Sequence, residues 1–159
     1  MKTEYLCVLM SLSLVFLTSC QSSRELTDMD RSRIKRQVLD VQQQIIQAAE
    51  NTDPETMFSH ILDNEGVIMQ NGLFHKSHRD ALDYSKERFV GVKELEYQFD
   101  HEIVEVLSPD KVLLKASGTS IVQTNNGREF KTPFCQTAVY TLTPDGWKIL
   151  HAHQSTPVR

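Results

Sequence analysis

The sequence predicts an α+β fold in which three N-terminal helices pack on a cone-like, curved antiparallel sheet. Two observations support this prediction. Apolar residues recur at helical spacing in the first half of the chain, and they alternate with polar residues from about Lys93 onward. Long strands in a small sheet must twist and bend. We therefore expect the helices to close the wide end of a cone and to leave a pocket against its concave face.

A long amphipathic helix is predicted from about Asp28 to Glu50. Either Thr27 or Asp28 can accept hydrogen bonds from the exposed amides of its first turn. The apolar residues of its buried face recur three or four positions apart: Ile34, Val38, Val41, Ile45, Ile46 and Ala49. Such a stripe requires a partner surface, which the predicted sheet supplies.

Two shorter helices flank a small hairpin. Residues 52–55, Thr-Asp-Pro-Glu, predict a helix start because they supply a capping oxygen, a proline in the first turn and an acid near the positive end of the helix dipole. Residues 66–70 predict a strand, the Asn71-Gly72 pair a tight turn, and residues 73–75 a brief return strand. Ser77 then caps a third helix that runs to about Val90.

The second half of the chain predicts a meander of four long strands. In the first strand, Leu95, Tyr97 and Phe99 alternate with charged or polar residues. Turns at residues 108–110, 125–127 and 144–146 contain the Pro, Asn, Asp and Gly residues that favour chain reversal. They separate the first strand from those predicted at residues 111–124, 128–143 and 147–155.

The first twenty residues predict an export signal. After Lys2, an apolar run from Tyr5 to Leu17 has the length of a signal-peptide core and falls short of the roughly 20 residues that a membrane-spanning helix needs. The run ends at Leu17-Thr18-Ser19-Cys20, which resembles the bacterial lipobox. The resemblance implies that residues 1–19 are a cleaved leader and that Cys20 carries the lipid. A plain secretory leader cleaved near Ser19 and an uncleaved anchor are the alternatives.

This leader sets the predicted location and organisation. Residues 20–27 would form a lipid-anchored tether, and residues 28–156 one α+β domain. Lipidation implies the cell envelope, and Gln21 rather than Asp after the cysteine points, in a Gram-negative cell, to the outer membrane facing the periplasm. Because Cys7 leaves with the leader and Cys20 takes the lipid, Cys135 remains alone and no internal disulfide can form.

Composition and motifs exclude several classes of function. The net charge is −4 and no basic run is longer than two residues, which argues against nucleic acid as a partner. The sequence contains no nucleophile motif, glycine-rich phosphate loop, Cys-x-x-Cys pair or zinc-protease signature. We therefore expect no cofactor.

The last predicted strand carries a family resemblance. Residues 145–155, Asp-Gly-Trp-Lys-Ile-Leu-His-Ala-His-Gln-Ser, together with the element order, resemble the nuclear-transport-factor-2-like, or SnoaL-like, superfamily. Within this superfamily, the same residues resemble the association (hub) domain of calcium/calmodulin-dependent kinase. The resemblance implies a cystatin-like cone and a homodimer. Hub domains carry pocket arginines at two positions that align here with Gln154 and Ala138, which puts a carboxylate-binding arginine cluster in doubt.

Two histidines of this strand are candidate pocket residues. His151 and His153 are two residues apart, so strand periodicity places both on the face of Trp147, a further pocket candidate. There they could hydrogen-bond a ligand or shuttle a proton. A zinc or copper site completed by His101 or His75 is one alternative, and a structural role in the curl of the sheet is another. Without a placed third ligand we expect no metal.

Other elements supply further candidates. Aromatic side chains on a concave sheet either form core or stack against a ligand. Cys135 alternates with the inward-facing positions of its strand and should face a dimer surface. The remaining pocket candidates lie on two strands and on the third helix: Tyr97, Phe99, Gln136 and Tyr84.

The sequence favours a non-enzymatic function. We expect an envelope lipoprotein whose domain binds a small apolar or mixed-polarity ligand or mediates assembly. The alternative is a cofactor-independent isomerase, dehydratase or cyclase that uses His151, His153 or Tyr84 as acid and base. Binding is favoured because no carboxylate base can be assigned to the pocket.

Overall fold

The computed structural model describes residues 25–64, 68–70 and 72–157. The predicted leader, Cys20 and most of the tether lie outside these residues, as do the start of the first predicted hairpin strand and Asn71. None of the described helices is both long and apolar enough to span a membrane.

The three predicted helices are confirmed. They are α1 (Asp28–Glu50), α2 (Pro54–Ser59) and α3 (His78–Phe89). Thr27 caps α1, since its hydroxyl accepts from the Asp30 amide at 3.1 Å while the Asp30 carboxylate bonds back to Thr27. The side chains of Asp53 and Ser77 accept a backbone amide in the same way at the starts of α2 and α3.

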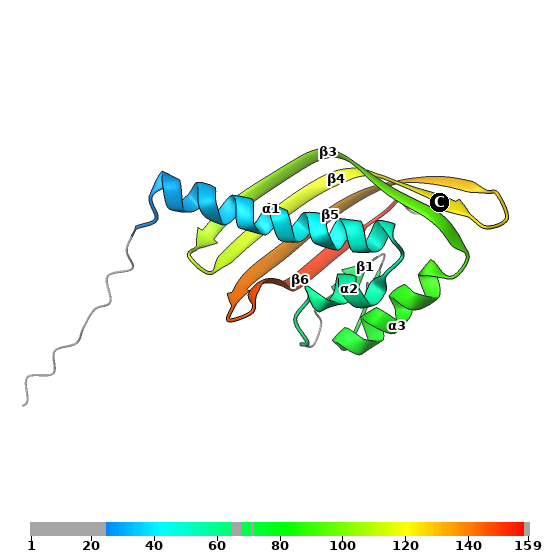
Figure 1. Ribbon diagram of the computed structural model, residues 1–159, viewed down its shortest axis with the longest axis horizontal. Helices are drawn as coiled ribbons and strands as arrows, with labels where there is room; N and C mark the ends of the chain where they lie inside the picture. Colours follow the sequence, from blue (N-terminus) through cyan, green and yellow to red (C-terminus); the bar gives the residue numbers. More distant parts are fainter. Residues whose placement is uncertain (1–24, 65–67, 71, 158–159) are drawn as a thin grey trace, which may run out of the picture.

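The predicted α+β class is confirmed by one curved sheet under these helices (Figure 1). Its strands are β1 (Ile68–Gln70), β2 (Leu73–Phe74), β3 (Val92–Ser108), β4 (Lys111–Thr124), β5 (Glu129–Thr143) and β6 (Gly146–Ser155). The order across the sheet is β2-β1-β6-β5-β4-β3. The four long strands form the predicted meander, whereas the parallel pairing of β1 with β6 was not predicted.

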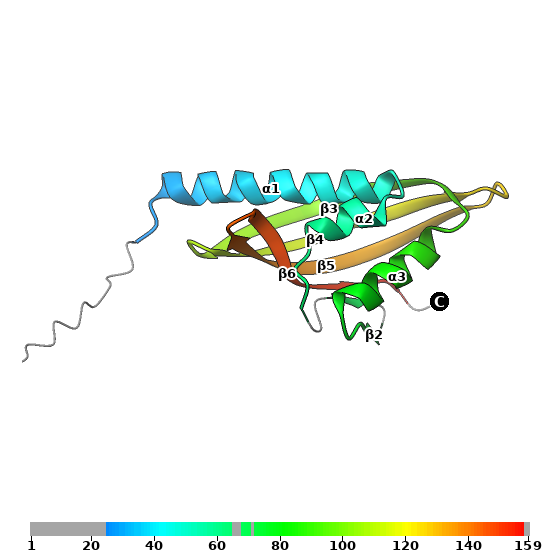
Figure 2. The same cartoon turned by 60° about the horizontal axis from the view of Figure 1, so that its bottom comes forward.

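The core lies between α1 and the concave face of the sheet, and α1 runs over the long strands (Figure 2). Val38 of α1 is fully buried, as are Val112, Leu114 and Tyr140 of the sheet. Two polar pairs join the layers. The Tyr140 hydroxyl donates to Oε1 of Gln42, and the Trp147 indole donates to Oε1 of Gln37 at 3.3 Å. These bonds fix the height of α1 over the sheet.

A β-bulge in β6 corrects the predicted position of the two histidines. Val139 pairs with His151, but the next residue of β5, Tyr140, pairs with Ile149, so Leu150 is an extra residue. Beyond a bulge, side chains change face. Ala152 therefore joins Ile149 on the concave side, while His151 and His153 turn to the convex side. The prediction that they share the face of Trp147 was wrong.

A second bulge, in β3, has the same effect on His101. Phe99 pairs with Gly118 and His101 with the adjacent Ser117, so Asp100 is the extra residue. Phe99 faces the concave side, whereas His101, which strict alternation along the strand would place beside Phe99, is exposed on the other side. The alternation of side chains between the two faces of a strand is therefore reversed at each bulge.

Candidate functional site

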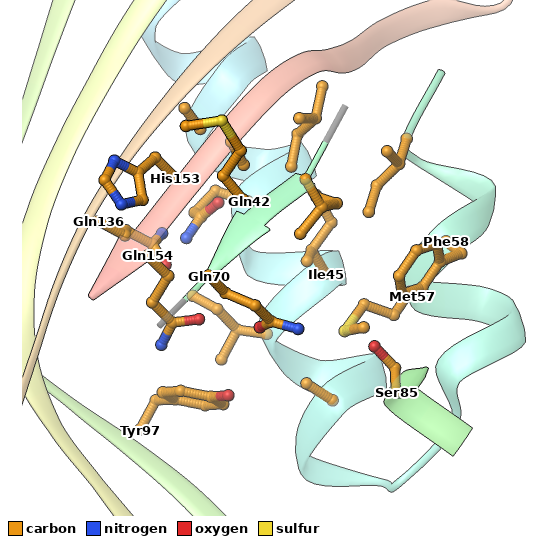
Figure 3. A pocket seen from close by; sticks show the side chains of 18 of the residues that line it. Gln42, Ile45, Met57, Phe58, Gln70, Ser85, Tyr97, Gln136, His153 and Gln154 are labelled. Atoms are coloured by element: carbon orange, nitrogen blue, oxygen red, sulfur yellow. The ribbon is translucent and has the colours of Figure 1, made fainter. Parts of the chain in front are cut away.

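A cavity of about 130 Å³ lies between α1, α2, α3 and the concave face of the sheet (Figure 3). Its lining is mostly aliphatic, aromatic and methionine side chains, with a few polar groups. The residues are Gln42, Ile45, Ile46, Ala49, Met57, Phe58, Ile61, Ile68, Met69, Gln70, Ser85, Tyr97, Phe99, Gln136, Ala138, Ile149, Ala152, His153 and Gln154. It has the composition of small-molecule sites, which are largely apolar with a few directed polar groups.

Three glutamines form a row across one wall of the cavity. Gln154 of β6 lies between its two register partners, Gln70 of β1 and Gln136 of β5. Residues paired across neighbouring strands point to the same face, so the three amides lie side by side, as Figure 3 shows. We call Gln70, Gln136 and Gln154 the glutamine row. The β6 bulge creates it, because without the extra residue Gln154 would face outward.

Several polar groups of the lining retain hydrogen-bonding capacity. Within the described part of the chain, the side chains of Gln136, Gln154 and Ser85 make no hydrogen bond, nor does the hydroxyl of Tyr97. Buried polar groups normally have partners. Groups that border a cavity without protein partners can bond water or a ligand there.

The lining is electrically neutral. Among the described residues that form it there is no Asp, Glu, Lys or Arg. Burial, and then the nearby Glu50 carboxylate, raise the pKa of Tyr97 above its ordinary value of 10.0. The phenol therefore stays protonated at physiological pH and can donate a hydrogen bond. Glu50 itself accepts from the backbone amide of Tyr97 at 3.0 Å.

An aromatic cluster lies beside this phenol. The Phe134 ring meets the rings of Tyr97 and Phe99 edge-on, with centroids 5.7 and 5.5 Å away. Such T-shaped contacts favour a fixed arrangement of the rings. Phe134 is buried and is not part of the lining, so it supports Tyr97 and Phe99 from behind.

The seven sequence candidates divide into two groups. Tyr97, Phe99 and Gln136 border the cavity from the concave face, and His153 of β6 meets only its exposed edge, because its side chain turns to the convex face (Figure 3). The other three do not. Trp147 is core, His151 faces the convex side, and the ring of Tyr84 packs on His75 with centroids 4.9 Å apart. The expectation that Tyr84 reaches into the pocket was wrong.

Most of the polar wall of the cavity was not predicted from the sequence. Gln154 was noted only because it aligns with an arginine of hub domains, and Gln70 only because it belongs to a predicted strand. Both Gln154 and Ala138, where hub domains would carry arginine, do line the cavity.

As for metals, the described residues contain no group of three or more His, Cys, Asp and Glu side chains that could hold an ion.

Comparison with solved structures agrees with the architecture. A candidate dehydratase of the NTF2-like family from Streptomyces avermitilis superposes with a TM-score of 0.71 at 18% identity, over 81% of this chain and 99% of that one. A candidate calcium/calmodulin-dependent protein kinase II association domain from Xanthomonas campestris gives 0.68 at 18%, over 77% and 86%. Hexachlorocyclohexane dehydrochlorinase LinA-type3 from Novosphingobium barchaimii gives 0.70 at 15%, over 83% and 92%.

At these identities the similarities show the fold alone. No curated protein matches the sequence significantly. A family model described as a SnoaL-like domain matches residues 38–159, which include every strand and most of α1. The chain therefore belongs to the SnoaL-like domain family.

Proposed function

We propose that this SnoaL-like domain binds a small, uncharged, largely apolar molecule that carries one or two hydrogen-bonding groups. The observation that supports this is the neutral cavity, in which the glutamine row and the Tyr97 hydroxyl face apolar walls. A charged ligand would lose its hydration without gaining a partner of opposite charge, which is costly. An alcohol, ketone or amide could satisfy the amides at little cost.

An enzyme of the isomerase, dehydratase or cyclase type is less well supported. Such chemistry needs a base in the cavity. The described lining offers no carboxylate. Its titratable side chains are His153, which is exposed at the border, and Tyr97. The raised pKa of Tyr97 disfavours the phenolate that would act as a base. The dehydratase and dehydrochlorinase neighbours share the fold at low identity. Binding therefore remains the favoured function.

A matched set of probes tests this proposal. In a chain that begins at Ser22, and so carries every described helix and strand, 1-indanol should raise the melting temperature, whereas indane-1-carboxylic acid at pH 8 should not. A ligand at 100 times its dissociation constant adds about 2.7 kcal/mol of stability. Gln136→Leu should weaken indanol binding about fivefold by NMR titration, since one neutral hydrogen bond is lost.

The control for that variant is Thr137→Val, because Thr137 follows Gln136 on the opposite face. It should leave the affinity for indanol unchanged. Equal shifts with the alcohol and the acid would contradict a neutral site. Probe contacts confined to residues outside the cavity would contradict the assignment of the site itself.

We also propose that the chain is anchored in the cell envelope by a lipid on Cys20, in the outer membrane if the cell is Gram-negative. Leu17-Thr18-Ser19-Cys20 after an apolar run supports this. The cavity would then serve a molecule that reaches the envelope surface.

A second copy of the chain is the partner that we propose for the convex face of the sheet. Phe74 of β2 and Ile103 of β3 are apolar yet 62% and 52% exposed. Between them lie mostly uncharged side chains, including those of Cys135, Thr137 and Val139. Sedimentation velocity should show a dimer that Phe74→Glu converts to monomer. Val90→Glu changes an equally apolar, 82% exposed residue outside the sheet and should leave the dimer intact.

A further inference from the structure

His75 is a buried polar residue just outside the cavity wall. It follows β2 and precedes α3, and it is only 4% exposed. Its backbone amide donates to the carbonyl of Ile68 at 3.3 Å, which ties it to β1. The Tyr84 ring covers it at a centroid distance of 4.9 Å. The imidazole is thus held in one place, with a polar group at each of its two nitrogens.

Those two groups differ in kind. Nδ1 lies 3.4 Å from Oδ2 of Asp80, a carboxylate on the first turn of α3. Nε2 lies 3.3 Å from the side-chain nitrogen of Gln70, a member of the glutamine row. The Lys76 amide also donates to the same Asp80 oxygen at 3.1 Å and holds it in position. A continuous path therefore runs from a surface carboxylate, through His75, to an amide of the cavity wall.

The chemistry of the path favours one arrangement of the protons. An ionised carboxylate can only accept, and a neutral imidazole has one donor nitrogen and one acceptor nitrogen. In the neutral ring, the Asp80 carboxylate 3.4 Å from Nδ1 favours the tautomer with the proton on Nδ1 and the lone pair on Nε2. The Nε2 lone pair can bond only to the NH₂ end of Gln70. The carbonyl oxygen is then the end that Gln70 presents to the cavity.

We propose that Asp80 and His75 are positioning residues that hold the Gln70 carbonyl toward the cavity and so select ligands with a hydrogen-bond donor, such as a hydroxyl. This inference rests on the proposed binding function and specifies its ligand class further. Gln136 and Gln154 are free of such a constraint among the described residues, so their amides can turn to suit either donor or acceptor. Within the glutamine row, Gln70 is therefore the residue whose amide is held in one orientation, with its nitrogen toward His75 and its oxygen toward the cavity.

The proton assignment is tested without any ligand. In the chain that begins at Ser22, the ¹⁵N shifts of the His75 ring at pH 8 distinguish the two neutral tautomers. We expect Nδ1 protonated and Nε2 bare. Asp80→Ala removes the acceptor and should increase the other tautomer. The matched control is Asp83→Ala, because both carboxylates lie on α3 and both side chains are 55% exposed. A wild-type ring protonated on Nε2 would overturn the proposal.

The selectivity is tested with two probes of the same skeleton. 1-Indanol carries a donor, whereas 1-indanone can only accept. The wild-type domain and Asp83→Ala should bind indanol about fivefold more tightly than indanone, because one neutral hydrogen bond, from the indanol hydroxyl to the Gln70 carbonyl, is lost with indanone. In Asp80→Ala the ratio should fall to about one. An unchanged ratio in Asp80→Ala would sink the positioning role. If neither probe binds, the proposed binding function fails, while the His75 tautomer still decides the proton assignment.

Discussion

Replacing Gly118 with alanine should lower the free energy of unfolding by about 3 kcal/mol or more, because the added methyl group has no room. A Cβ atom built at Gly118 would lie 2.1 Å from the carbonyl oxygen of Gln98 and 3.0 Å from Cα of Phe99. Both are backbone atoms, so no side-chain rotation can relieve the clash. Relief would require β3 to move away from β4 beside the cavity.

The close approach at Gly118 arises from the Asp100 bulge. Gly118 pairs with Phe99, the last residue before the extra one, where the bulged strand bends toward its neighbour. Urea unfolding followed by circular dichroism would measure the loss. Ser117→Ala, one residue earlier and paired with His101 on the convex face, should change stability little. Equal midpoints for Gly118→Ala and wild type would mean that the two strands do not approach this closely.

The helices and strands that are predictable from the sequence are those whose ends are set by local chemistry. Pro54 and its neighbours fix the start of α2, and Ser77 fixes that of α3. Turn residues delimit the long strands almost to the residue. For example, Gly127 has a φ of 81° and Gly146 one of 106°, conformations that glycine adopts without strain. Such signals act within a few residues and are visible in the sequence.

The errors arose where long-range pairing decides the outcome. The residue types of Asp100 and Leu150 do not predict a β-bulge. Each is nevertheless the extra residue of a bulge, and the side chains that follow it lie on the opposite face of the sheet from the one that alternation predicts. His151 and His153 were misplaced for this reason, and strict alternation would misplace His101 in the same way. The glutamine row is equally non-local, because Gln70 is 84 positions from Gln154 and becomes its neighbour only through the parallel pairing of β1 with β6. No local pattern contains that register.

Replacing Cys20 with serine should release the proposed lipoprotein from the membrane entirely. In the proposed lipoprotein, acyl chains on Cys20 hold the domain on the bilayer, and each buried CH₂ contributes about 0.8 kcal/mol. Serine has no thiol to take the lipid. Cys20→Ser should therefore abolish labelling by a fatty-acid probe and move the protein to the soluble fraction. Cys135→Ser, the matched control in β5, should retain both label and membrane fraction. Label that survives in Cys20→Ser would disprove the anchor at this residue.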